Sequence, residues 1–395
     1  MVEQKIRNGY KQTELGIIPE DWIIKKISDF TDATSGGTPS TFIKEYWNGD
    51  IRWMNSGELN LKKVFDVEGR ITELGLKKSA TKLIPKKCIL IGLAGQGKTR
   101  GTVAMNYVEL CINQSIGAIL PNESFDPEYL YYNLDSRYKE LRKISTGGEG
   151  RGGLNLTLIR NISIPLPPTV KEQSIIKKIL QDLDHLLDSL ETLIQKKKNI
   201  KQGAMQELLT GKRRLDGFSG EWETKRLGEL LNYEQPTAYL VQYTNYDDSN
   251  TIPVLTAGKS FILGYTNEDK GIFQNYPVII FDDFTTESKF VEFPFKVKSS
   301  AMKILKTRNN QVNLEFVFEM MQIINFSRGG HKRYWLSEYQ FLEVKIPKLN
   351  EQKAISKILS DMDSEIEQLE NQLNKYTNLK QAMIQKLLTG EIRLI

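Results

Sequence analysis

One stretch of this chain occurs twice, and it constrains the fold more than any other feature of the sequence. Residues 172–215 and 351–394 align at a constant offset of 179 without a gap, and 21 of the 44 aligned residues are identical. Neither copy contains proline between its opening Glu-Gln and its closing Leu-Leu-Thr-Gly. Such a long ungapped match predicts two copies of one extended, rigid element.

Each copy has the periodicity of a long amphipathic helix, because its apolar residues recur three and four positions apart. In the first copy the stripe consists of Ile176, Ile179, Leu183, Leu186, Leu190, Leu193 and Ile200, widened by Leu180, Leu187 and Ile194. In the second copy it consists of Ile355, Ile358, Met362, Ile366, Leu369, Leu373, Leu379 and Met383. Gly211 and Gly390 stand where the C-terminus of a helix favours a left-handed backbone. A helix of about 38 residues is a rod of roughly 57 Å.

A single apolar stripe cannot stabilise a rod of that length in water, so each helix needs a partner. Two matched helices separated by an insert the size of a domain can pair with each other within one chain. We expect them to pair in antiparallel fashion through Ile176, Leu183, Leu190, Ile355, Met362 and Leu369. The alternative is a coiled coil that makes the chain a homodimeric scaffold.

The segments ahead of the helices repeat as well, although little identity survives in them. Trp22 aligns with Trp222 at an offset of 200, and residues 51–57 align with 252–258 at 201. The whole chain is therefore predicted to be a tandem duplication. The two non-helical segments have about 150 and 130 residues, which is enough for an independent core in each. Both mix strand-like runs, glycine-rich loops and one helix-like run, so we expect an α+β fold.

Composition excludes several classes of protein. The chain has 395 residues, 39% of them hydrophobic and 26% charged, with no run of 18 apolar residues and a polar N-terminus, so we expect a cytoplasmic protein without a membrane span. Two cysteines and two histidines provide neither a disulfide framework nor a metal site, and we expect Cys88 and Cys111 to fill core positions. The net charge of +5 belongs to the segments outside the two nearly charge-balanced helices, where a polyanion would bind.

Residues Gly92 to Thr99 match the phosphate-binding pattern GxxxxGK[ST], so a P-loop nucleotide hydrolase is the main alternative function. In such a site the loop leads directly into a helix, whereas Arg100 to Val103 favour an extended chain here. Residues 278–283 resemble the acidic strand that would hold magnesium. They occupy the corresponding position of the other half of the duplication, however, so the two pieces cannot share one site.

Basic loops provide better candidates for a binding site. Lys and Arg neutralise phosphates, and Gln or Arg can reach base edges in the major groove of DNA. The candidate DNA-binding residues are Gln96, Lys98, Thr99, Arg100 and Arg151 in the first half, and Lys289, Arg328, His331, Lys332 and Arg333 in the second. Ordinary solvated loops are the alternative.

Several motifs together resemble one family, the specificity subunit of Type I restriction-modification systems, over essentially the full length. They are TELGIIPEDW at 13–22, GGTPS at 36–40, the two Ile-Pro to Glu-Gln junctions, and the two helix ends that read KQ to LLTG. The resemblance implies an α+β fold with two α/β target recognition domains in tandem repeat, separated by two long antiparallel coiled-coil helices and related by a pseudo-twofold. The implied division is 1–165 and 214–345 for the recognition domains, and 166–213 and 346–395 for the helical spacers.

In that family each recognition domain reads one half of a bipartite double-stranded DNA target. The resemblance therefore implies two methyltransferase subunits and restriction-translocase subunits as partners. It also implies that S-adenosylmethionine, ATP and magnesium bind to the partners and no cofactor or metal binds to this chain. Consistent with a non-catalytic subunit, the single Pro-Pro pair, Pro167-Pro168, is followed by Thr and lacks the aromatic residue that an amino-methyltransferase uses.

Overall fold

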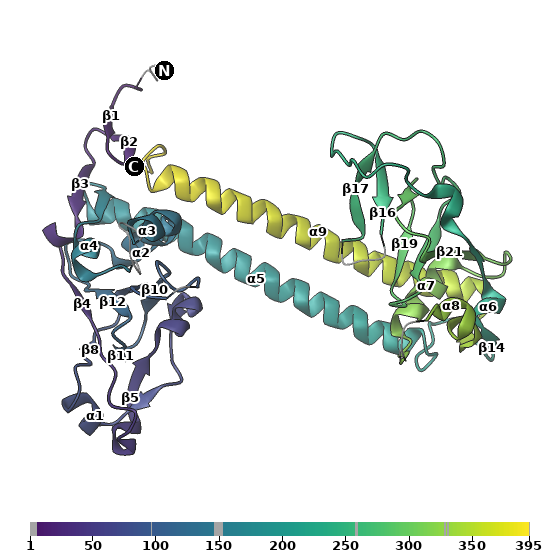
Figure 1. Cartoon of the computed structure of the whole chain (residues 1–395), viewed down its shortest axis with the longest axis horizontal. Coiled ribbons are helices and arrows are strands. Elements are labelled where there is room, and N and C mark those ends of the chain that lie inside the picture. The colour runs from purple at the N-terminus through teal and green to yellow at the C-terminus, as the bar shows by residue number, and fades with distance from the viewer. Residues whose placement is uncertain are drawn as a thin grey trace. The chain divides into compact units, whose positions relative to one another are not determined.

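A computed structural model describes residues 6–95, 97–145, 153–256, 260–327, 329 and 332–394. The chain forms two compact units (Figure 1). Unit 1 comprises Met1–Leu190 together with Gln372–Ile395, and unit 2 comprises Glu191–Asn371. Unit 1 therefore contains the beginning of the first long helix and the end of the second, and unit 2 contains the complementary parts.

The sheets of unit 1 surround a core that includes the fully buried Trp22 and Tyr129. Its strands are β1 (Tyr10–Thr13), β2 (Gly16–Pro19), β3 (Ile23–Lys26), β4 (Ala33–Ser35), β5 (Trp47–Met54), β6 (Lys63–Val64), β7 (Arg70–Ile71), β8 (Leu83–Ile84), β9 (Ile89–Gly92), β10 (Val103–Asn106), β11 (Leu110–Ile112), β12 (Ile116–Ile119) and β13 (Ser163–Leu166). The larger sheets have the orders β4-β12-β9-β10-β6 and β7-β5-β11-β8, and β3 pairs with β13. Its short helices are α1 (Glu73–Lys77), α2 (Pro127–Ser136), α3 (Tyr138–Ile144) and α4 (Leu156–Arg160).

Unit 2 repeats this topology in a reduced form. Its strands are β14 (Glu223–Arg226), β15 (Leu231–Glu234), β16 (Ile252–Leu255), β17 (Ile262–Thr266), β18 (Val278–Asp282), β19 (Ser288–Val291), β20 (Lys296–Val297), β21 (Met302–Thr307) and β22 (Glu343–Ile346). Their orders are β15-β21-β18-β19, β17-β16-β20 and β14-β22. Its short helices are α6 (Leu227–Leu230), α7 (Leu314–Ile323) and α8 (Tyr334–Ser337). Each order matches a segment of a unit 1 sheet, which confirms the predicted tandem duplication.

The two long helices are α5 (Val170–Leu208) and α9 (Leu349–Leu387), and each begins two residues before its Glu-Gln. In unit 1, Ile176 and Leu180 near the start of α5 share one core cluster with Leu387 at the end of α9. In unit 2, Leu208 at the end of α5 shares a cluster with Ile355 near the start of α9. Within each unit the two helices therefore run in opposite chain directions, as Figure 1 shows. The antiparallel pairing predicted from the sequence is confirmed.

Only one edge of the apolar stripe on α5 is buried, and its other edge is exposed. One row of buried and half-buried positions, alternately four and three apart, runs the length of the helix through Ile176, Leu180, Leu183, Leu187, Leu190, Ile194, Lys197, Lys201, Ala204 and Leu208. The same positions plus 179 are the buried and half-buried face of α9, from Ile355 through Met362 and Leu369 to Leu387. The prediction that Leu186, Leu193, Ile200 and Leu379 belong to the seam was wrong, since they are 37–47% exposed. In a band this wide, the spacing alone does not show which edge faces the partner.

Ion pairs repeat along the seam with the same offset. In unit 1, Lys380 of α9 pairs with Asp184 of α5. In unit 2, Lys201 of α5 pairs with Asp363 of α9 at 2.5 Å. The two lysines correspond at 179 and so do the two aspartates, so each helix contributes the lysine of one pair and the aspartate of the other. These pairs set the register of the helices, because a shift by one turn would separate both.

A second reciprocal contact joins the start of each long helix to the end of the other. Glu172 binds Arg393 through two hydrogen bonds of 2.6 and 3.0 Å. Glu351 binds Arg214 in the same bidentate way, at 2.6 and 2.7 Å. Both carboxylates are almost fully buried, and a planar guanidinium matches a carboxylate in this geometry. These contacts give a structural role to the Glu-Gln and Arg-Leu motifs at the two ends of the repeat.

Glycine ends both long helices as predicted. Gly211 and Gly390 have φ of +70° and +71°, in the left-handed region that favours glycine. A Cβ at Gly390 would lie 2.5 Å from Pro19, whereas at Gly211 the nearest atom, in Trp222, is 3.4 Å away. The chain then turns back, so that the arginine of each bidentate pair can reach the other helix.

Both cysteines lie in the core of unit 1, as their count suggested. Cys88 and Cys111 are fully buried and unpaired by disulfide. Burial raises the pKa of the Cys88 thiol to about 12 and that of Cys111 to about 11. No helix in the described part of the chain is both long and apolar enough to span a membrane.

Candidate nucleic-acid interface

The loop that contains Lys98 joins two antiparallel strands of the unit 1 sheet. β9 pairs with β10 in antiparallel fashion, and the amide of Gly101 donates to the carbonyl of Gly92. The segment after Thr99 therefore returns along β9 as a strand, and no helix follows it. A phosphate-binding loop needs the amides of a following helix N-terminus, so the P-loop alternative is rejected.

Side chains of helix α3 bind the backbone carbonyl groups of this loop, and the Lys98 side chain of the loop remains exposed. The Tyr138 hydroxyl donates to the Lys98 carbonyl at 3.0 Å, and Arg142 donates to the Gly97 carbonyl at 2.6 Å. The Thr102 hydroxyl also donates to the Lys98 carbonyl. The Lys98 side chain is exposed, while Thr99 and Arg100 are half-buried. A loop fixed through its carbonyl groups can present a cation without losing much freedom on binding.

One backbone hydrogen bond brings the two candidate loops of unit 1 together. The amide of Leu154, directly after the glycine-rich stretch 145–153, donates to the carbonyl of Leu93 at 2.9 Å. Leu93 opens the loop that contains Lys98. The described ends of two segments, about 60 residues apart in sequence, therefore lie side by side.

The same junction exists in unit 2. The amide of Tyr334 donates to the carbonyl of Asp283 at 2.8 Å. Asp283 opens the loop after β18 that leads to Lys289, and Tyr334 directly follows Lys332 and Arg333. Leu93 directly follows β9, which pairs with β12, and Asp283 directly follows β18, which pairs with β21 in the same way. The two residues are therefore equivalent. Both units thus bring their two candidate loops together by the same hydrogen bond.

The candidate cations of unit 2 differ in how they are engaged. Lys289, Lys332 and Arg333 are exposed, but Lys289 lies on strand β19 and not in a loop as predicted. Lys332 forms an ion pair with Glu338, and this hydrogen bond raises the pKa of Lys332. Part of its charge is therefore compensated within the protein. Of the predicted residues, Gln96, Arg151, Arg328 and His331 lie outside the described residues, and nothing is concluded about their placement.

The sequence did not reveal the residues that hold the loops. Tyr138 and Arg142 are four apart on a short helix with ordinary composition, and only the fold places them against the Lys98 loop. Lys303 lies fully buried on β21 and pairs with Asp283 at 3.2 Å, although its position in Met-Lys-Ile-Leu-Lys suggests an outward-facing side chain. No sequence signal would have identified these contacts.

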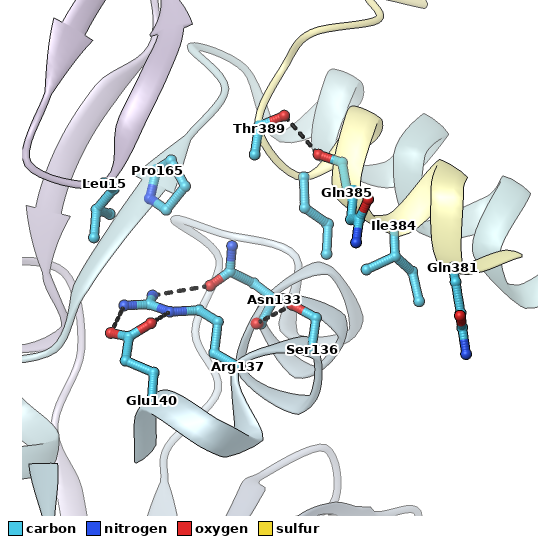
Figure 2. A pocket seen from close by; sticks show the side chains of 11 residues that line it. Leu15, Asn133, Ser136, Arg137, Glu140, Pro165, Gln381, Ile384, Gln385 and Thr389 are labelled. Atoms are coloured by element: carbon cyan, nitrogen blue, oxygen red, sulfur yellow. Dashed lines mark hydrogen bonds and ion pairs between the residues drawn. The ribbon is translucent and has the colours of Figure 1, made fainter. Parts of the chain in front are cut away.

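A groove of about 440 Å³ in unit 1 is a competing site, but its charges do not suit a polyanion (Figure 2). Arg137 points along its wall and binds both oxygens of Glu140, at 2.8 and 2.5 Å. The opposite wall contains the amide side chains of Gln381 and Gln385 from α9. Since its arginine and carboxylate neutralise each other, the lining of the groove offers no net charge to a polyanion. Among the described residues no group of three or more His, Cys, Asp or Glu side chains could hold a metal ion.

The family of the chain follows from a comparison with known proteins. The model of the Type I restriction modification DNA specificity domain matches residues 19–202 and again 219–376, which together cover most of the chain. This chain belongs to that family. The chain contains two copies of the family's domain, as the tandem duplication requires.

Similar proteins in the family cover different parts of this specificity subunit. It is 50% identical to the EcoR124I/EcoR124II specificity subunit of Escherichia coli over 148 residues, which are 36% of each chain. It is 31% identical to the MjaIX specificity subunit of Methanocaldococcus jannaschii over 255 residues, which are 59% of this chain and 57% of the relative. The putative MjaX specificity subunit of the same organism is 24% identical and aligns over 98% of this chain and 97% of its own length.

Solved structures show the same fold. The S subunit of the Type I restriction-modification system from M. genitalium matches 97% of this chain and 98% of its own with a TM-score of 0.63 at 16% identity. A chain from a study of assembly and conformational transition of the Type I system matches 95% of this chain with a TM-score of 0.54. These likenesses support the α+β architecture with its long paired helices.

Proposed function

We propose that the two loop pairs bind double-stranded DNA, each reading one half of a bipartite target. The observation that carries the proposal is the shared junction, in which Leu154 donates to Leu93 in unit 1 and Tyr334 donates to Asp283 in unit 2. An anchoring hydrogen bond that both units share, with different exposed residues beside it, suits two recognition surfaces of different specificity. Lys98 and Arg100 in unit 1, and Lys289, Lys332 and Arg333 in unit 2, provide phosphate contacts or base readout.

The rest of the complex supplies the chemistry. Two methyltransferase subunits dock on this chain, and restriction-translocase subunits join them in the cytoplasm. S-adenosylmethionine, ATP and magnesium bind to those partners. In this chain, residues 1–165 and 214–345 act as the recognition domains, with 166–213 and 346–395 as spacers. The family assignment supports assembly with other restriction-modification subunits and DNA.

The first test identifies the target. Sequencing host DNA for methylated adenines, with and without this gene, gives the bipartite sequence that the complex modifies. The complex is then titrated with a duplex of that sequence at several salt concentrations. Lys98→Ala is expected to weaken binding and to reduce the slope of log K against log salt by about 1, as the loss of one phosphate contact does.

A matched substitution controls for general loss of charge. Lys178→Ala removes an exposed lysine from α5, outside the candidate loops, and is expected to leave affinity and slope unchanged. Equal effects of the two substitutions would contradict the proposed site. The same Lys98 variant tests the rejected hydrolase function, since neither it nor the wild-type chain is expected to bind a nucleotide.

A further inference from the structure

The most unusual side chains in unit 2 are Asp283 and Lys303. Both side chains are 0% exposed, and their charged groups are 3.2 Å apart. The Lys303 ammonium and the facing Asp283 oxygen have no hydrogen-bond partner among the described residues, so the contact between them is ionic. A buried ion pair recovers little more than the cost of desolvating it. Stability alone therefore does not account for this pair.

Asp283 makes three hydrogen bonds, one to the residue before β21 and two to the start of α8. Its amide donates to the carbonyl of Ala301, and its carbonyl accepts from the amide of Tyr334. Its carboxylate accepts from the amide of Trp335 at 2.8 Å. The carboxylate thus binds a free amide in the first turn of α8, which is the role of a helix N-cap.

Helix α8 needs this cap because it lacks one of its own. Its N-cap residue is Arg333, whose side chain makes no capping hydrogen bond. In unit 1, helix α4 follows the same junction and is capped by its own Asn155, which accepts from the amide of Leu158 at 2.8 Å. In unit 2 the N-cap residue of α8 is a cation, and the cap comes from the neighbouring loop.

The equivalent positions in unit 1 show that the fold does not require the charges. Strand register places Leu93 at the position of Asp283 and Gly117 at that of Lys303. A side chain added at Gly117 would meet Ile159 at 2.8 Å and Leu93 at 3.0 Å, so this site in unit 1 is filled by apolar groups. The same scaffold is therefore stable without an ion pair here.

We propose that Asp283 and Lys303 are positioning residues for the second half of the DNA target. Asp283 caps α8 from the adjacent loop, so that the N-cap position can be occupied by Arg333. Lys303 pairs with that carboxylate inside the protein. The pair thereby fixes Lys332 and Arg333 where they meet DNA. The inference rests on the proposed function of these loops.

The decisive variant replaces both charges together. Asp283→Leu with Lys303→Met gives unit 2 an apolar pair like that of unit 1, without leaving a single buried charge. The variant chain, assembled with its methyltransferase subunits, is titrated with the target duplex and with duplexes mutated in either half. We expect a thermal transition close to that of the wild type and affinity for the intact target reduced about 10- to 100-fold, the range for losing one hydrogen bond to an ionised group.

Binding of duplexes mutated in one half of the target shows whether the variant has lost the positioning of one loop or the structure of the whole protein. In the double variant, mutating the half of the target read by unit 2 is expected to have little further effect, while mutating the other half weakens binding as in the wild type. Asn155→Ala removes the corresponding cap in unit 1 and is the matched control. It should leave discrimination of the unit 2 half intact.

Two outcomes would overturn the inference. One is a folded double variant that still discriminates the unit 2 half with wild-type affinity. The other is a folded double variant that loses discrimination of both halves equally. Arg333→Ala tests the proposed function separately. If this substitution does not change DNA binding, the loop that contains Arg333 does not contact DNA, and the proposed function fails rather than the positioning role of Asp283 and Lys303.

Discussion

Glu319 is a buried acid at a place where the other unit has a tyrosine, and replacing it is expected to stabilise unit 2. Glu319 lies on α7 and is 4% exposed. One of its oxygens accepts from Lys201 at 3.3 Å, and the other has no hydrogen-bond partner among the described residues. The equivalent residue in unit 1 is Tyr132, whose hydroxyl donates to Asp184 at 2.6 Å. The Tyr132 hydroxyl gives the aspartate a hydrogen-bond donor, whereas an ionised Glu319 competes with Asp363 for Lys201.

The direction in which the pKa of Glu319 is shifted determines whether its contribution to stability falls or rises with pH. Burial raises this pKa, and the nearby Asp363 raises it further against the attraction of Lys201. The folded chain therefore holds the proton to a higher pH than the unfolded chain does. Stability is lost as the pH rises from the unfolded pKa through the folded pKa, and the full penalty is present above the latter.

Glu319→Gln removes the charge and keeps the shape of the side chain. A buried polar atom without a partner costs about 1–3 kcal/mol, so we expect a gain of about 1–2 kcal/mol at pH 8 and little change near pH 4.5. Native-state hydrogen exchange of α7, compared between variant and wild type at the same pH, measures the local free energy of opening.

Two variants act as controls. Glu319→Tyr introduces the residue found in unit 1 and should also stabilise α7 at pH 8. Tyr132→Phe removes the hydroxyl in unit 1 and should weaken protection of α2 by about 1 kcal/mol without affecting α7. A gain from Glu319→Gln that is equal at both pH values, or a loss at pH 8, would refute the reasoning.

Three further predictions test the helix ends and the core. Arg214→Met leaves the buried Glu351 carboxylate unpaired and should lower the urea midpoint for unfolding of unit 2; an unchanged midpoint would show that the pair is dispensable. Gly390→Ala and Gly211→Ala should each cost about 1–2 kcal/mol for a left-handed alanine, with a larger loss of thermal stability at Gly390, so equal losses would count against the steric argument. Cys88, with its raised pKa, should resist a thiol reagent at pH 8 until urea unfolds the chain, and rapid labelling of the native protein would contradict its burial.

The duplication made much of the architecture predictable. A constant offset of 179 gives matched positions on the two long helices the same contacts in several places, among them the ion pairs of Lys201 and Lys380 and the bidentate contacts of Arg214 and Arg393. Local chemistry supported the same conclusion at particular residues. Asp126 and Asn313, aligned in the two halves, cap α2 and α7 through their own side chains. Such features depend on neighbours in sequence, which a pattern can show.

The candidate loops were predictable only in part. Glycine and basic residues marked the segments around Lys98 and Lys332, and the extended chain after Thr99 was enough to argue against a nucleotide site. In each unit the described ends of the two segments meet through a single backbone hydrogen bond between residues about 50 to 60 positions apart. A backbone hydrogen bond leaves no mark on residue type, so composition could not predict it.

The sequence by itself determined that the chain is doubled, that its two helices are long and matched, and that glycine ends each of them, because periodicity, offset and left-handed backbone are properties of local residue order. Tertiary structure alone decided which edge of the apolar band is buried, leaving Leu193 exposed, and that Lys303 lies inside beside Asp283. The physical reason is that burial and pairing belong to contacts between distant segments. The same lysine on a strand is a surface charge or a buried one according to what packs against it.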